Sequence, residues 1–131
     1  MSALTATSSG TILIVDDEPF ILDVMSRLLG DAGYEIHTCY LWSGIANAVR
    51  IRQPNLVLLD YNMPGLRGDA ICEILKRSAP ASGMKIVLFS SEDEDELANI
   101  VQECGADGYI LKGTPANELV RCISETLAGA N

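Results

Sequence analysis

The stretch from Leu56 to Asp69 reads LVLLDYNMPGLRGD and decides how the chain folds. Four consecutive apolar residues, Leu56–Leu59, are followed at once by the acid Asp60 and then by a turn that contains proline and glycine. An apolar run without polar alternation is typical of a strand buried on both faces, as in parallel sheets that helices cover on each side. The pattern therefore places Asp60 at the carboxyl end of a central strand.

Similar runs occur on both sides of this stretch. ILIV at 12–15 and IVLF at 86–89 are also apolar throughout, whereas Tyr34–Cys39 and Gly108–Leu111 are more polar and suit sheet edges. Helical periodicity fills the intervals and predicts helices that begin near Pro19, Gly44, Asp69, Ser91 and Pro115. Five such units in about 120 residues cannot close an eight-stranded barrel. We therefore expect an α/β fold with an open, doubly wound (βα)5 parallel sheet of five strands.

Local signals mark three helix ends. Ser91 and Glu94 have the spacing of a capping box at the start of the fourth helix. Thr114 and Pro115 predict a cap and a first-turn proline for the last helix. Gly105 is placed to end the fourth helix in the left-handed conformation.

Composition narrows the functional classes. The chain has 131 residues, which is ordinary for one domain, and a formal net charge of −9. This acidic balance argues against binding of nucleic acid by the chain itself and against an anionic membrane surface. No apolar run approaches the ~18 residues of a membrane-spanning helix. The four cysteines form no CxxC pair, so we expect them to be reduced and buried in a cytoplasmic protein.

Residues 1–10, MSALTATSSG, have neither the basic nor the apolar region of a signal peptide. We expect them to form a flexible tail, followed by a folded domain over residues 11–128.

Polar residues follow four of the five predicted strands. Because the carboxyl ends of parallel strands meet at one edge of a sheet, we expect these residues to converge there. Carboxylates packed together repel one another, and a divalent cation such as Mg²⁺ relieves that repulsion. One carboxylate of such a cluster can attack phosphorus while a cation, a hydroxyl and an ammonium group stabilise the phosphoryl group. The residues are Asp16, Asp17, Glu18, Asp60, Ser90, Ser91 and Lys112.

As a set, the motifs ILIVDDEP, LVLLDYNMPGLRGD, IVLFSS and GADGYILKG resemble those of two-component response-regulator receiver domains. The resemblance extends from about Gly10 to Ala128. It implies the flavodoxin-like strand order 2-1-3-4-5, which the chemotaxis receiver also has. It also implies a phosphorylation-dependent signalling switch that catalyses only its own phosphorylation and dephosphorylation.

The resemblance assigns roles to individual residues. Asp60 is the expected phosphoacceptor, and Mg²⁺ or Mn²⁺ is expected at Asp16, Asp17, Asp60 and the backbone carbonyl of Asn62. Ser90 matches the switch hydroxyl, Lys112 matches the lysine that pairs with the phosphoryl group, and Tyr109 matches the aromatic residue whose ring moves inward when the hydroxyl moves. Asn62, Glu92 and Ser91 are expected to tune dephosphorylation, with a phosphoryl lifetime of seconds to minutes.

Two positions depart from the family pattern. Lys112 is followed by Gly113 where receivers usually have proline, and Ser91 follows the switch hydroxyl where alanine or glycine is usual. Glycine permits a turn after the lysine, whereas a serine narrows access to the phosphoryl site slightly.

The resemblance implies the partners, and the site residues weigh against two rival functions. The expected phosphodonor is a sensor histidine kinase or a histidine phosphotransfer protein, and the output passes to a downstream protein or a separate output domain. The alternative is a pseudo-receiver, an interaction module that phosphorylation does not control. A haloacid-dehalogenase-type phosphatase needs an acid where this chain has Asn62. A flavodoxin-type FMN carrier would have its phosphate repelled by Asp16, Asp17 and Glu18.

Overall fold

In the computed structural model, residues 9–65, 67–78 and 83–129 are described, and their strands form one five-stranded sheet. The order across the sheet is β3-β2-β4-β5-β6, and each neighbouring pair is parallel. This is the predicted order 2-1-3-4-5. The strands are β2 (Thr11–Val15), β3 (Glu35–Cys39), β4 (Leu56–Asp60), β5 (Lys85–Ser90) and β6 (Gly108–Leu111).

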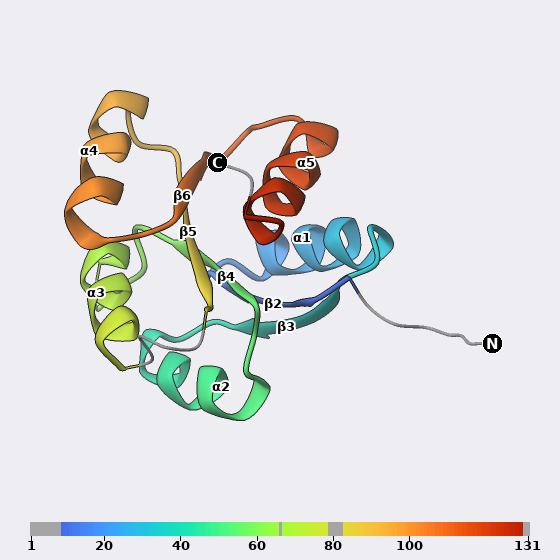
Figure 1. Cartoon of the computed structure of the whole chain (residues 1–131), viewed down its shortest axis with the longest axis horizontal. Helices are drawn as coiled ribbons and strands as arrows, with labels where there is room; N and C mark the ends of the chain where they lie inside the picture. The colour runs from blue at the N-terminus through green and yellow to red at the C-terminus, as the bar shows by residue number, and fades with distance from the viewer. Residues whose placement is uncertain (1–8, 66, 79–82, 130–131) are drawn as a thin grey trace.

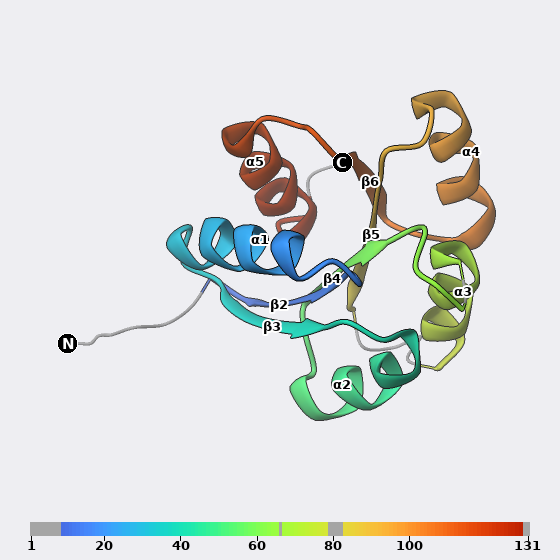
Figure 2. The ribbon, with the colours of Figure 1, turned by 180° about the vertical axis from the view of Figure 1, so that it is seen from behind.

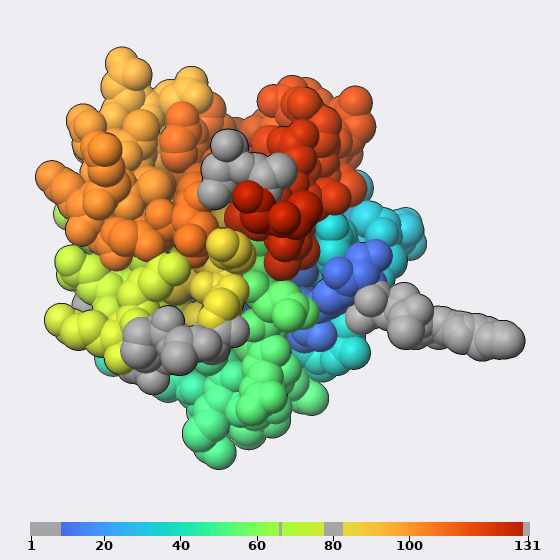
Figure 3. All heavy atoms as spheres, viewed as in Figure 1, coloured from blue at the N-terminus to red at the C-terminus, as the bar shows by residue number. Residues whose placement is uncertain are grey.

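Helices cover both faces of the sheet, as the apolar strands predict. Helices α1 and α5 lie on one face, and α2, α3 and α4 lie on the other (Figures 1 and 2). The atoms of α3 and α4 adjoin in the space-filling view (Figure 3). The helices are α1 (Pro19–Asp31), α2 (Ile45–Arg52), α3 (Gly68–Ser78), α4 (Glu94–Cys104) and α5 (Ala116–Leu127), and a 3-10 turn, η1 (Trp42–Gly44), precedes α2.

The apolar runs are explained by two cores, one on each face of the sheet. In β2, Ile12 and Ile14 pack in the core under α1 and α5, whereas Leu13 and Val15 pack in the core under α2, α3 and α4. Each of these four side chains is at most 1% exposed. Burial of such a side chain stabilises the fold by roughly 1.5–3 kcal/mol. Because both faces of the strand are buried, every position is apolar and the strand shows no alternation of polar and apolar residues.

Two of the three predicted helix ends differ from the structure. The cap of α4 is Asp93, whose side chain accepts a hydrogen bond from the Glu96 N–H at 3.2 Å, so the capping box of Ser91 and Glu94 was wrong. The α4 helix begins two residues later than that prediction required. At α5 the cap position is Pro115 and the helix begins at Ala116, so the Thr114 cap and the first-turn Pro115 were wrong; the Thr114 hydroxyl donates instead to the Leu111 carbonyl at 2.6 Å. Gly105 ends α4 with φ 82°, as predicted.

The remaining fold predictions concern the amino terminus and the cysteines. Residues 1–8 of the predicted tail lie outside the described residues. The next two residues lead into β2 and are hydrogen-bonded to the start of β3 and the residues before it, because the Ser9 N–H donates to the Gly33 carbonyl and the Gly10 carbonyl accepts from the Glu35 N–H. The four cysteines are free thiols, but the prediction that all are buried was wrong, because Cys39 and Cys122 are half-buried. Among the helices described, none is long and apolar enough to cross a bilayer.

Candidate functional site

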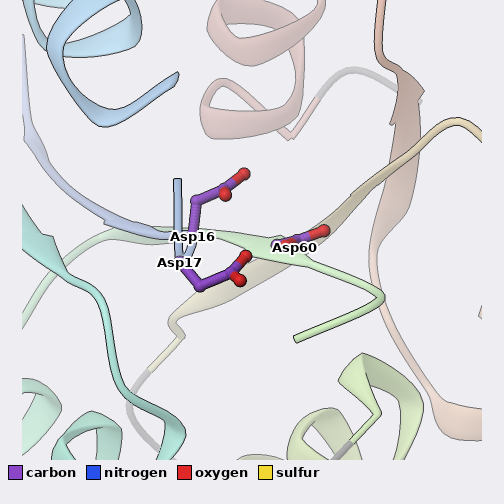
Figure 4. A group of neighbouring side chains, drawn as sticks. All are labelled: Asp16, Asp17 and Asp60. Atoms are coloured by element: carbon purple, nitrogen blue, oxygen red, sulfur yellow. The ribbon is translucent and has the colours of Figure 1, made fainter. Parts of the chain in front are cut away.

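Three carboxylates converge at the carboxyl edge of the sheet (Figure 4). Asp60 is the last residue of β4, and Asp16 and Asp17 directly follow β2, the strand paired with β4 in parallel register. One oxygen from each of the three side chains lies within 4.8 Å of the others. Asp16 is 0% exposed and Asp60 3%, whereas Asp17 is exposed. The parallel register therefore brings together the acids that the sequence placed at separate strand ends.

Lys112 joins this cluster from the far side of β5. Its Nζ lies 3.2 Å from Asp60 Oδ1, 3.4 Å from Asp16 Oδ2 and 3.9 Å from Glu18 Oε1. The lysine follows β6, which is two strands away from β4, so its long side chain bridges the width of β5. Its ammonium group also lies 5.5 Å from the centroid of the Phe89 ring on β5. The single ammonium group of Lys112 thus pairs with two buried carboxylates, those of Asp16 and Asp60.

The negative charge of the cluster exceeds what the lysine neutralises. Burial, and then the charge of Asp16, raise the pKa of Asp60, although Lys112 opposes this shift. Burial alone would lower the pKa of Lys112, but the neighbouring Asp60 and Asp16 outweigh it and raise that pKa. Asp60 is therefore harder to ionise than a carboxyl group in water.

Asp16 has one oxygen that remains available to a ligand. Its Oδ1 accepts a hydrogen bond from the Glu18 N–H at 2.9 Å, which fixes the side chain. Its Oδ2 is buried and, beside the 3.4 Å ion pair with Lys112, has no hydrogen-bond partner among the residues that the structure describes. Buried polar atoms are normally satisfied, so an unsatisfied carboxylate oxygen beside two other carboxylates fits a hard cation such as Mg²⁺. The donor set is thus suited to the metal that the sequence predicted.

Ser90 is the last residue of β5 and is 1% exposed. Its carbonyl accepts a hydrogen bond from the Lys112 N–H at 2.8 Å, and its Oγ accepts one from the Glu92 N–H at 3.1 Å. Since β5 lies between β4 and β6, Ser90 occupies the same sheet edge as Asp60 and Lys112. The hydroxyl is held by its own loop.

Asn62 and Glu92 are in direct contact across this edge. The Asn62 side-chain amide donates to Glu92 Oε2 at 3.1 Å, and its backbone N–H donates to Asp60 Oδ1 at 3.3 Å. The loops after β4 and β5 are thus joined by side chains 30 residues apart. Tyr109 lies on β6, and its hydroxyl donates to Glu94 Oε2 at 2.9 Å.

Two glycines that follow β4 shape the approach to Asp60 and were not predicted: Gly65 in the loop and Gly68 at the first position of α3. Gly68 donates its N–H to the Tyr61 carbonyl at 2.7 Å, and a Cβ there would lie 2.8 Å from Tyr61 Cα. Gly65 has φ 100°, and a Cβ there would overlap the Trp42 ring. The glycines of LVLLDYNMPGLRGD were the available signal in the sequence, but the spacing does not show which contacts require them: Gly68 lies against Tyr61, and Gly65 lies against Trp42. They let the loop return close to Asp60.

Gly113, which stands where receivers usually have proline, forms a turn after the lysine. The Lys112–Gly113 peptide is trans, and Gly113 has φ 95°, in the region that favours glycine. The chain therefore turns from β6 into α5 at this glycine. Ser91, the other departure, is exposed.

Comparisons with known proteins agree with this geometry. A family model described as "Response regulator receiver domain" matches residues 12–124. The DNA-binding response regulator MtrA of Mycolicibacterium smegmatis is 33% identical over 109 residues, which cover 83% of this chain and 46% of that protein. The phosphate regulon transcriptional regulatory protein PhoB of Pseudomonas aeruginosa is 34% identical over 119 residues, which cover 89% of this chain and 51% of that protein.

A solved structure shows the same likeness in three dimensions. The CheY-like response regulator receiver domain protein of Methanospirillum hungatei matches with a TM-score of 0.83 and 29% identity, over 92% of this chain and 94% of that one. The chain spans about half the length of the curated relatives it matches. Sequence, fold and site composition agree, and the chain belongs to the receiver-domain family of response regulators.

Proposed function

We propose that this receiver domain is a phosphorylation-dependent switch whose phosphoacceptor is Asp60. The observation that carries the proposal is the convergence of Asp16, Asp17 and Asp60 with the Lys112 ammonium group at one edge of the sheet. Several carboxylates that share a single lysine lower the stability of the folded state. Such a cluster is explained if it takes part in phosphoryl transfer, as in a receiver domain. Response regulators are signalling proteins, so the chemistry that we propose is limited to the domain's own phosphorylation state.

The phosphoryl transfer that we propose uses Asp60 as the nucleophile. A carboxylate oxygen of Asp60 attacks the phosphorus of a phosphohistidine on a donor protein. The phosphorus–nitrogen bond breaks, and the imidazole leaves with its electron pair and takes up a proton. The product is an acyl phosphate on Asp60. Lys112 lies 3.2 Å from Asp60 Oδ1, where its ammonium group can stabilise negative charge on the phosphoryl oxygens.

A divalent cation fits the same edge. Asp16, Asp17 and Asp60, with the backbone carbonyl of Asn62, would hold Mg²⁺ or Mn²⁺, and waters would complete the shell. When bound, the ion supplies positive charge that offsets the repulsion between carboxylates and the charge on the phosphoryl group. Asp16 Oδ2 supports this proposal, because it is buried and has no partner beyond its 3.4 Å ion pair with Lys112 among the described residues.

The signal is proposed to leave the site through the loop after β5. Ser90 would donate its hydroxyl to a phosphoryl oxygen, and Tyr109 would move inward as that hydroxyl moves. The change would then reach the surface formed by α4, β6 and α5. This surface would control a downstream protein or an output domain, which fits the coverage of about half of the curated relatives.

The lifetime of the phosphoryl group is proposed to depend on the bridge between Asn62 and Glu92. A small amide at Asn62 and an acid at Glu92 would leave room for an attacking water and would orient it; the hydrogen bond between the two side chains at 3.1 Å supports a joint role. Ser91 narrows the entrance slightly. We expect a lifetime of seconds to minutes.

The partner and the compartment are also proposals. The phosphodonor is a sensor histidine kinase or a histidine phosphotransfer protein, and the domain acts in the cytoplasm. We propose a folded domain over residues 11–128 that binds no nucleic acid itself, in keeping with the net charge of −9.

Acetyl phosphate tests the proposed chemistry without a kinase. The full chain with Mg²⁺ should gain one phosphoryl group by intact mass, and Asp60→Asn should gain none. Asp31→Asn, which makes the same change at an exposed position, should still be modified. A wild-type chain that gains no phosphoryl group, and binds no beryllofluoride, would contradict the proposal.

A further inference from the structure

The hydroxyl of Tyr109 is tied to the first residue of α4. Tyr109 is the second residue of β6, and its ring packs against the core beneath α2, α3 and α4. Its hydroxyl donates to Glu94 Oε2 at 2.9 Å, in a hydrogen bond exposed to solvent. This hydrogen bond, followed by burial, raises the pKa of Tyr109. The carboxylate thus holds the polar end of a half-buried aromatic ring at the surface.

The same short segment is tied to the phosphoacceptor edge. Ser90 Oγ accepts from the Glu92 N–H at 3.1 Å, and the Glu92 carboxylate accepts from the Asn62 side chain at 3.1 Å. Two residues later, Glu94 accepts from Tyr109. The segment 90–94 therefore contacts the loop after Asp60 through Glu92 and the β6 residue Tyr109 through Glu94. A displacement of Ser90 toward a phosphoryl oxygen would act on the segment that carries Glu94.

We propose that Glu94 is a positioning residue, which stabilises the resting position of Tyr109 and so sets how readily the domain switches. This inference rests on the proposed function. The hydrogen bond exists only while the Tyr109 hydroxyl is at the surface, so it favours the resting state over any state in which the ring has moved inward. A contact made in one state alone shifts the equilibrium by its own free energy. Loss of Glu94 should therefore favour the activated state.

Beryllofluoride, a mimic of the phosphoryl group, measures this equilibrium in the purified full chain with Mg²⁺. We expect Glu94→Ala to tighten its binding on the order of fivefold, at the low end of ordinary coupling between two sites. Glu103→Ala removes the same charge at an exposed position near the other end of α4 and should leave the affinity near that of the wild type. Because Glu94 is exposed, we expect the variant to fold, and a thermal melt checks this.

A double-mutant cycle separates the hydrogen bond from the loss of a negative charge. Tyr109→Phe removes the same hydrogen bond without changing the net charge, so it should also tighten binding. If both substitutions act through one bond, the double variant should match either single variant. If the effects of the two substitutions simply add, Glu94 does not act through its hydrogen bond with Tyr109 and the proposal is wrong.

The ring of Tyr109 gives a second readout. In chain labelled with ¹³C in its tyrosine rings, the Tyr109 resonance of unliganded Glu94→Ala should move toward its position in wild type saturated with beryllofluoride. A resonance that stays at the resting wild-type position would overturn the inference. Wild type that binds no beryllofluoride would instead refute the proposed function, and the role of Glu94 with it. The two failures are therefore distinguishable.

Discussion

At the scale of single residues, Asp60 works against the stability of the fold at neutral pH. Its folded-state pKa lies above the ordinary value of 3.8, because of burial and the neighbouring Asp16. A raised folded-state pKa adds stability that is fully present below the unfolded pKa and is lost as the pH rises through the folded pKa. At pH 7 the ionised carboxylate therefore lowers the free energy of unfolding.

The substitution Asp60→Asn removes this charge at every pH. In EDTA at pH 7 we expect it to raise the free energy of unfolding by about 0.5–2 kcal/mol, measured by urea denaturation. The gain should shrink toward zero as the pH falls below the ordinary carboxyl pKa of 3.8, where the carboxyl is protonated in both the folded and the unfolded wild type. Asp31→Asn, at an exposed position, should change stability by less than about 0.5 kcal/mol. A gain for Asp60→Asn that does not vary with pH would contradict this electrostatic account.

At the scale of elements, the start of α4 depends on one side chain. Asp93 accepts the Glu96 N–H at 3.2 Å, and the acids Glu94, Asp95 and Glu96 of the first turn face the positive end of the helix dipole. Asp93→Ala should therefore lower the free energy of unfolding by about 1 kcal/mol. Ser91→Ala is the matched control, because Ser91 is exposed and is not the cap, and its effect should stay within about 0.5 kcal/mol. A larger loss for Ser91→Ala than for Asp93→Ala would contradict the observed cap.

At the scale of the whole molecule, binding of Mg²⁺ should appear as global stability. A ligand that binds the folded state alone stabilises it by RT ln(1 + [L]/Kd), which is about 1.4 kcal/mol at ten times Kd. We expect Mg²⁺ to raise the melting temperature more than sodium chloride at equal ionic strength does. Sodium chloride controls for general screening of the net charge of −9.

Asp17→Ala should abolish most of this response to Mg²⁺. Asp17 is exposed, so the variant should fold, and with one repelling carboxylate fewer its melting temperature without metal should equal or exceed that of the wild type. Asp31→Ala, also exposed, should respond to Mg²⁺ as the wild type does. An unchanged response in Asp17→Ala would refute the proposed metal site.

The helix ends show where reasoning from local sequence fails. Ser91 and Glu94 have the spacing of a capping box, yet Asp93 and Glu96 have the same three-residue separation and the structure uses the latter pair. Several hydrogen-bonding residues in a row make alternative caps nearly equivalent locally. Packing of Leu97 and Ile100 in the core fixes the helix, and this choice selects the cap.

The sequence by itself determined the α/β class, the five parallel strands and the residues that end them, because burial on both faces leaves apolar runs that local inspection detects. The family resemblance added the strand order. Only the tertiary structure decided the contacts between side chains of different loops, such as Asn62 with Glu92 and Tyr109 with Glu94. It also decided that the Lys112 ammonium group pairs with both Asp16 and Asp60, and that Asp16 Oδ2 has no partner beyond this ion pair among the described residues. These features depend on the distances between atoms far apart in the chain, which periodicity and spacing do not encode.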